Sequence, residues 1–99
     1  MMILKINPLV VKDLKGIREY IANDNANKAI EMVENIYKVF ESIQQFPAMG
    51  ADLSKRVSFK TNYKYVVWEN YIVLYKFGHD YVEIYRVVNR FQDITRIFN

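Results

Sequence analysis

The stretch YIVLYKFGHDYVEIYRVV, residues 71–88, decides the fold of this chain. It contains two runs rich in aromatic and β-branched residues, Tyr71–Phe77 and Tyr81–Val88, and this composition is typical of strands. Gly78-His79-Asp80 predicts a tight turn between them. Both runs are apolar at even and odd positions, which predicts strands that are covered on both faces or are central to a sheet.

Two helices are predicted upstream of these strands. Asn7-Pro8 is a helix-start signal, because asparagine can cap a helix and proline at the first helical position loses no hydrogen bond. An apolar stripe at helical spacing follows and should stop within residues 23–25. Its members are Val10, Leu14, Ile17 and Ile21, and the other face carries Lys12, Asp13, Lys15, Arg18 and Glu19.

The second helix is expected to begin near Ala26, after a cap at Asn25, and to end at Phe46-Pro47. Its apolar stripe is Ala29, Val33, Ile36, Phe40 and Ile43. The short joint between the helices predicts an antiparallel αα-hairpin.

Residues 2–6 read as a short strand, and a further strand-like run extends from Val57 to Val67, with a register that is ambiguous by one residue. The expected order is β-α-α-β-β-β with a C-terminal tail. The sequence therefore predicts a single α+β domain over residues 1–99, with the αα-hairpin packed on a small, mainly antiparallel sheet.

Composition limits the classes of function. The 99 residues include no cysteine and one histidine, and no carboxylate cluster has ligand spacing, so neither a metal site nor a cofactor is expected. The absence of cysteine fits a reducing compartment. The N-terminus lacks the pattern of a signal peptide, and no apolar run is long enough to span a membrane, so a soluble cytoplasmic protein is expected.

Charge is distributed unevenly along the chain. The formal net charge is +3, and the excess of basic residues lies in residues 55–99. A basic half suggests an anionic partner such as nucleic acid or an acidic protein segment, although a solvated mixed surface would look the same. The many tyrosines of this half could stack on bases or fill a core, and the core interpretation is favoured.

Arg86 and Arg90 stand out near the end of the last strand. By strand alternation Arg86 should share a face with Val82, Ile84 and Val88, so it must reach the sheet edge or pair with an acid such as Glu69 or Asp93. Arg90 lies just past the strand end, where functional groups often sit on a rigid scaffold.

Four segments in order resemble the toxins of the RelE/ParE superfamily of bacterial type II toxin–antitoxin modules. These segments are NPLVVKDLKGIREYIA (7–22), ESIQQFPAMG (41–50), YKYVVWENYIVLYKF (63–77) and IYRVVNRFQDITRIF (84–98). The resemblance spans essentially the whole chain. It implies either RelE-like cleavage of mRNA on the ribosome or ParE-like poisoning of DNA gyrase.

The resemblance to the ParE-like branch is closer. Ribonuclease members typically carry arginine where Ile72 stands, histidine or lysine at the place of Asn89, and in some cases tyrosine at the place of Arg96. A proton-transfer pair is therefore missing, because asparagine is neither an acid nor a base. Gyrase poisoning by binding is expected, with these candidates for target binding: Arg56, Lys60, Lys64, Arg86, Asn89, Arg90 and Arg96.

Two alternatives stay open. An mRNA endoribonuclease could use Tyr63, Tyr65 or Glu69 as acid or base. A binding module without toxicity would only hold an acidic partner. The resemblance also implies a hetero-oligomer with a cognate antitoxin, whose acidic and partly disordered segment could fold onto a groove rimmed by Leu9, Tyr20 and Tyr37.

Overall fold

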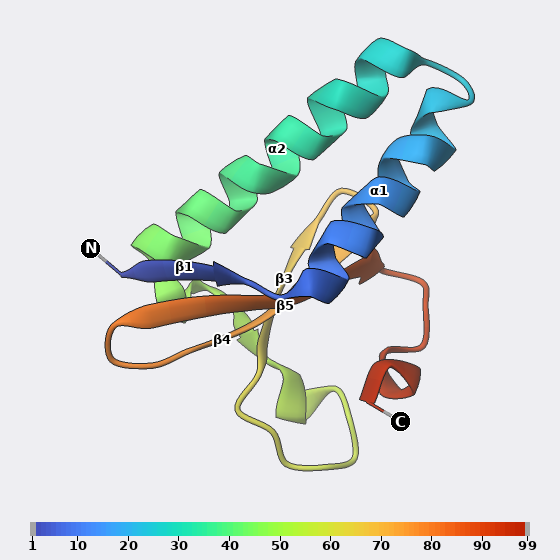
Figure 1. Cartoon of the computed structure of the whole chain (residues 1–99). Coiled ribbons are helices and arrows are strands. Elements are labelled where there is room, and N and C mark those ends of the chain that lie inside the picture. The colour runs from blue at the N-terminus through green and yellow to red at the C-terminus, as the bar shows by residue number, and fades with distance from the viewer. Residues whose placement is uncertain (1, 99) are drawn as a thin grey trace.

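The computed structural model describes residues 2–98, and Figure 1 shows two helices lying over a twisted sheet. The helices are α1 (Pro8–Ala22) and α2 (Ala26–Gln45), and the strands are β1 (Ile3–Ile6), β2 (Ala51–Asp52), β3 (Lys64–Trp68), β4 (Tyr71–Phe77) and β5 (Tyr81–Asn89). Short 3-10 turns occupy Pro47–Met49, Leu53–Lys55 and Ile94–Phe98. No helix within residues 2–98 is long and apolar enough to cross a membrane.

The strands of the sheet follow the order β1-β5-β4-β3-β2. β1 runs parallel to β5, and the other neighbouring strands are antiparallel. The prediction of an α+β fold with an αα-hairpin on a mainly antiparallel sheet is confirmed.

Both helices begin at the predicted caps. The Asn7 side chain accepts a hydrogen bond from the Leu9 N–H at 2.9 Å, and the Asn25 side chain accepts one from the Lys28 N–H at 3.0 Å. The apolar stripes pack on the sheet and form a first core, whose buried members are Val10, Leu14, Ile36, Phe40, Ile43, Val73, Tyr75, Val82, Ile84 and Val87.

A second core lies on the sheet face away from the helices. Its buried members are Leu53, Ile72, Leu74, Val88 and Ile94. Residues 53–63 and the C-terminal 3-10 turn supply the cover, since Val57, Tyr63, Ile97 and Phe98 pack against this cluster. The apolar character of Tyr71–Phe77 at both parities is thereby explained.

The strand expected over residues 57–67 is shorter in the structure. β3 begins only at Lys64, and residues 57–63 form an irregular segment. The physical reason is the second core, because Val57 is used to cover the sheet rather than to extend it. β2 is an additional strand of two residues that pairs with the start of β3.

A β-bulge changes the parity of β5. Leu74 is opposite Arg86 whereas Tyr75 is opposite Ile84, so Tyr85 is an extra residue in the ladder. Val87 therefore belongs to the first core and Val88 to the second. Arg86, opposite Leu74, and Val88, opposite Ile72, share a face as expected. Val82 and Ile84 lie on the other face, because strict alternation does not hold across a bulge.

Tyr75 anchors the chain where it leaves α2. Its buried hydroxyl donates to the Pro47 carbonyl at 2.7 Å and accepts from the Gly50 N–H at 2.8 Å. A Cβ at Gly50 would lie 2.5 Å from this hydroxyl, so the close approach requires glycine. The Tyr75 hydroxyl therefore explains why the segment QFPAMG, residues 45–50, ends in glycine.

Candidate functional site

Arg86 is tied to α1. Its Nε and one terminal guanidinium nitrogen each donate to a different carboxylate oxygen of Asp13 at 2.8 Å. The Val87 N–H, next to the bulge, donates to the same carboxylate at 2.9 Å. The Asp13 hydrogen bond raises the pKa of Arg86. The predicted partners Glu69 and Asp93 were wrong, and so was the placement of Asp13 on the solvated face of α1.

This pairing could have been suspected from sequence only through position. Asp13 immediately precedes Leu14 and lies four residues before Ile17, so it borders the apolar stripe of its helix. A carboxylate at such a border can reach a cation on the sheet beneath. Because its guanidinium is bound to Asp13, Arg86 serves to hold α1 on β5.

Asn89 and Arg90 form the end of β5 and are clamped to the β3–β4 turn. The Arg90 N–H donates to the Asn70 carbonyl at 2.8 Å, and its guanidinium reaches the Glu69 carbonyl at 3.4 Å. The Asn89 side chain accepts from the Phe91 N–H at 2.9 Å. Both residues are exposed, so the strand end presents an arginine on a fixed backbone.

The other basic candidates lie away from this strand end. Lys64 begins β3 and pairs with Asp52 at 2.8 Å, which lowers the pKa of Asp52. Arg56 lies over the Tyr65 ring, 5.2 Å from its centroid. Since β3 has five residues, its two ends are separated by about 13 Å. Arg56 and Lys64 therefore do not form one site with Arg90, and Lys60 lies in the irregular segment 57–63.

Arg96 is exposed on the C-terminal 3-10 turn. The turn is capped by Asp93, whose carboxylate accepts from the Thr95 hydroxyl at 2.7 Å and from the Thr95 N–H at 3.1 Å. These two hydrogen bonds lower the pKa of Asp93. The turn holds the cover of the second core in place.

Most tyrosines of the sheet half serve the core. The rings of Tyr63 and Tyr85 lie 5.0 Å apart, and Phe98 stacks on Tyr85 at 5.7 Å. Burial raises the pKa of Tyr63 and of Tyr75. Burial also raises the pKa of Tyr71, which is half-buried and packs against the first core near the end where α1 and α2 join.

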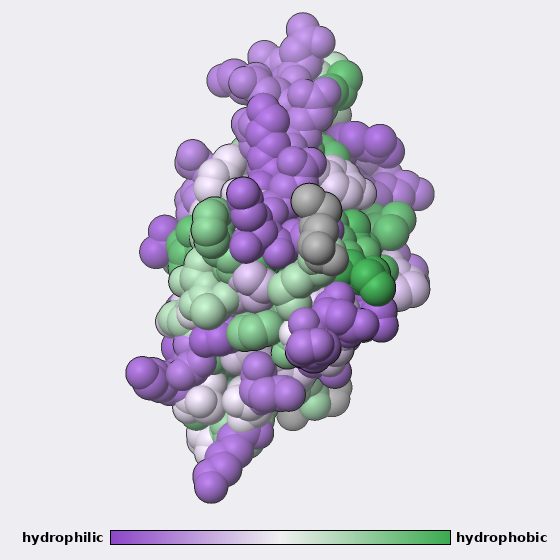
Figure 2. Space-filling model, turned by 90° about the vertical axis from the view of Figure 1, so that its left-hand side faces the viewer, coloured by the Kyte–Doolittle hydropathy of each residue, from purple (hydrophilic) through white to green (hydrophobic). Residues whose placement is uncertain are grey.

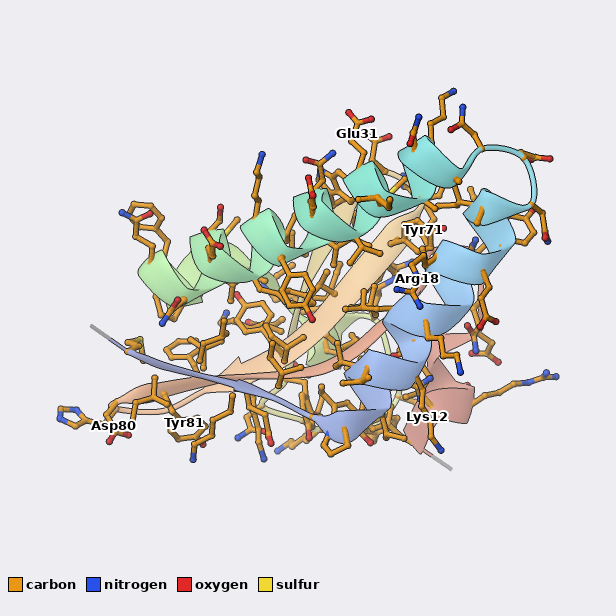
Figure 3. The ribbon with its side chains drawn as sticks, turned by 45° about the horizontal axis from the view of Figure 1, so that its top comes forward. Lys12, Arg18, Glu31, Tyr71, Asp80 and Tyr81 are labelled. Atoms are coloured by element: carbon orange, nitrogen blue, oxygen red, sulfur yellow. The ribbon has the colours of Figure 1, made fainter. Side chains whose placement is uncertain are left out.

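Two hollows meet at Tyr20 and Tyr71. One, of about 450 Å³, is lined also by Met32 of α2 and by Trp68 at the end of β3. The other, of about 410 Å³, extends along α1 to Asn89. In Figure 3 Tyr71 is seen between the two helices, toward the end where they join. Trp68 was not predicted as a site residue, because in the sequence it is one aromatic residue among several in a strand.

A separate groove of about 240 Å³ runs between α1 and α2. Val11, Leu14, Val33 and Tyr37 line it, and Lys15 and Arg18 give it a basic bank. Figure 3 shows Arg18 on the side of α1 that faces α2 and Lys12 on another side.

The three residues that were predicted to rim one groove, Leu9, Tyr20 and Tyr37, lie in different places. Tyr37 lies in the groove between the helices, whereas Tyr20 lines the two hollows at the hairpin end. Leu9 is exposed in the first turn of α1.

The β1 side of the molecule carries another apolar surface. Figure 2 shows hydrophobic residues gathered in the middle of this face, between polar regions above and below. A hollow of about 760 Å³ here is lined by Met2 and Leu4 of the N-terminal segment and by Glu41, Gln44 and Gln45 of α2. The Gln44 amide donates to the Met2 carbonyl at 2.6 Å and ties the two elements together.

No group of three or more histidine, cysteine, aspartate or glutamate side chains within residues 2–98 is placed to hold a metal ion. The exposed features are instead an arginine-bearing strand end, apolar hollows and a groove with a basic bank. These features belong to a small α+β protein with two helices on a five-stranded sheet.

The chain matches the family model described as ParE toxin of the type II toxin–antitoxin system parDE, over residues 4–94. It therefore belongs to the ParE toxin family. A solved structure, described as the chromosomal ParDE toxin–antitoxin system from P. aeruginosa, is similar with a TM-score of 0.74 and 22% identity, covering 90% of this chain and 96% of that chain. That likeness shows a shared fold. No curated protein sequence matches the chain.

Proposed function

We propose that this ParE-family toxin inhibits growth by binding DNA gyrase and trapping the enzyme on cleaved DNA. The observation that carries the proposal is the family match over residues 4–94, since gyrase poisoning is the usual activity of this family. The protein would act by binding, without covalent chemistry of its own.

The surroundings of Ile72 and Asn89 support gyrase poisoning over mRNA cleavage. These are the positions at which ribonuclease members typically carry basic residues. Ile72, which follows Tyr71 where ribonuclease members carry arginine, is fully buried in the second core. A cation cannot replace it at that depth without a partner. Asn89 uses its side chain to hold the turn at Phe91.

The remaining acid and base candidates are poorly arranged for proton transfer. Burial raises the pKa of Tyr63, so its phenolate is scarce near neutral pH. Tyr65 and Glu69 are four residues apart along β3 and its turn, a separation of about 13 Å. A general acid and base must both reach the same phosphate within hydrogen-bond distance.

The test is a cleavage assay with purified protein, DNA gyrase, supercoiled plasmid and ATP, in which linear DNA is scored after the enzyme is denatured. Dose-dependent linear DNA is the expected result. Topoisomerase I with the same plasmid is the control for nonspecific nicking. Absence of linear DNA at large protein excess would contradict the proposal, and ribosome-dependent cleavage of mRNA would then support the alternative.

We further propose that a cognate antitoxin binds the groove between α1 and α2 through an acidic amphipathic segment. The floor of Val11, Val33 and Tyr37 offers apolar contact, and Lys15 and Arg18 offer charge complementarity. Val11 is 61% exposed and Tyr37 41% exposed, so both are available to a partner.

Charge reversal tests this groove. The double variant Lys15→Glu/Arg18→Glu is expected to weaken antitoxin binding at least 10-fold, measured by titration calorimetry. Lys38→Glu is the matched control, because Lys38 lines a different surface, between α2 and β3. Equal affinities for both variants would refute the assignment of the groove.

A further inference from the structure

The end of the helical hairpin where α1 and α2 join carries a group of aromatic residues that the fold does not fully bury. We call this group the aromatic corner, and define it as Tyr20, Trp68, Tyr71 and Phe91 together with Arg90. Tyr20 is 77% exposed and Phe91 is 81% exposed. Tyr20, Trp68 and Tyr71 line two hollows, and Phe91 stands in the chain between Asn89 and Gln92, which line one of them. Exposed large aromatic rings at such hollows mark a surface that a partner covers.

Rigid elements hold the aromatic corner. Trp68 ends β3 and Tyr71 begins β4, and the two residues are opposite each other in the ladder. Tyr71 is also paired with Asn89 of β5, and the Arg90 N–H is bonded to the Asn70 carbonyl. The Arg90 guanidinium lies 5.7 Å from the centroid of the Phe91 ring. A surface fixed in this way loses little conformational entropy when a partner binds.

The charges around the aromatic corner favour a protein partner over nucleic acid. The charged side chains that line the two hollows are Lys12, Asp13, Lys28, Glu31, Glu69 and Arg86. These are three basic and three acidic groups, and Asp13 and Arg86 already neutralise each other. A DNA backbone requires a predominantly basic surface, whereas tyrosine, tryptophan and arginine are the residues enriched at protein hot spots.

We infer that the aromatic corner is the surface through which this toxin docks on the protein part of its target. The inference rests on the proposed function, in which that target is gyrase. The complementary face would place apolar side chains in the two hollows and a carboxylate against Arg90. Arg56 and Lys64, at the far end of β3, are not part of this contact.

The test uses the full-length single variants Tyr20→Ala and Phe91→Ala. Phe46→Ala is the matched control, because Phe46 is 62% exposed at the opposite end of α2. Gyrase affinity is measured by surface plasmon resonance, and linear DNA is measured in the cleavage assay. Circular dichroism establishes that each variant is folded.

Each corner variant is expected to bind gyrase at least 10-fold more weakly and to lose cleavage complexes in proportion, while Phe46→Ala matches wild type. Unchanged affinity and cleavage in both corner variants would overturn this inference and leave the proposed function standing. A wild-type protein that neither binds nor poisons gyrase would overturn both.

Discussion

The Asp13–Arg86 pair joins α1 to β5, and breaking it is expected to destabilise the protein more than an ordinary surface ion pair would. The side chains of Arg86 and Asp13 are 22% and 11% exposed, and both guanidinium hydrogen bonds are 2.8 Å long. Truncating one member of a fully buried pair costs about 3–5 kcal/mol, whereas an exposed pair contributes about 0–1 kcal/mol. At this intermediate burial Arg86→Ala should lower the free energy of unfolding by about 2–3 kcal/mol.

Asp13→Ala should cost more than Arg86→Ala. It removes the same ion pair and also leaves the Val87 N–H at the bulge without its acceptor. An orphaned N–H of this kind adds about 1 kcal/mol or more. For a domain of this size the total corresponds to a melting temperature lowered by about 15 °C.

A double-mutant cycle isolates the interaction. In the Asp13→Ala background, Arg86→Ala should have little further effect, so the coupling free energy is expected to be about 2–3 kcal/mol. Equilibrium unfolding in urea, followed by the fluorescence of Trp68, the one tryptophan of the sequence, gives the four free energies.

The pair Lys76–Glu83 provides a matched control between the neighbouring strands β4 and β5. Its N–O distance is 3.7 Å and its side chains are 33% and 28% exposed, so its coupling should stay below about 0.5 kcal/mol. If the Asp13–Arg86 coupling were equally small, the reasoning that Arg86 serves the fold rather than target binding would be refuted.

Two hydrogen-bonded anchors outside the hairpin are testable in the same way. Tyr75→Phe removes the bonds to Pro47 and Gly50 and should lower the free energy of unfolding by about 2 kcal/mol in the urea assay; a loss below about 0.5 kcal/mol would contradict the anchoring role. Asp93→Ala removes the cap at Thr95, and because the folded-state pKa of Asp93 lies below 3.8, its contribution is present above about pH 4 and is lost as the pH falls further. The difference in melting temperature between wild type and Asp93→Ala should therefore shrink below pH 4, and a difference that does not change with pH would count against the cap.

The sequence was sufficient for the elements that depend on local patterns. Apolar residues at helical spacing placed both helices, and the caps Asn7 and Asn25 fixed where they begin. The apolar character of β4 at both parities predicted two covered faces, which the two cores confirm. These features follow from short-range periodicity, which is legible in one chain.

What the sequence could not supply depends on contacts between distant residues. The Asp13 carboxylate and the Arg86 guanidinium are separated by 73 positions, and the bulge at Tyr85 has no local signature in the sequence. For the candidate site, Asn89 and Arg90 were correctly placed at a strand end. The gathering of Tyr20, Trp68 and Tyr71 beside it arises from the helical hairpin, the β3–β4 turn and the end of β5 meeting at one corner.

The bulge decides how the arginines near the end of β5 are divided between fold and surface. It pairs Arg86 with Leu74 and Val87 with Val73, and the Asp13 carboxylate of α1 binds the Arg86 guanidinium and the Val87 N–H at once. After the bulge the side chains of β5 alternate again between the two faces. Val88 therefore lies in the second core, and Arg90 is exposed beside the β3–β4 turn. Arg86 therefore fixes the strand that presents Arg90, and a change at Arg86 should weaken target binding mainly through the loss of folded protein. Arg86→Ala measured at low temperature, where the variant is folded, should thus lose less gyrase affinity than Arg90→Ala.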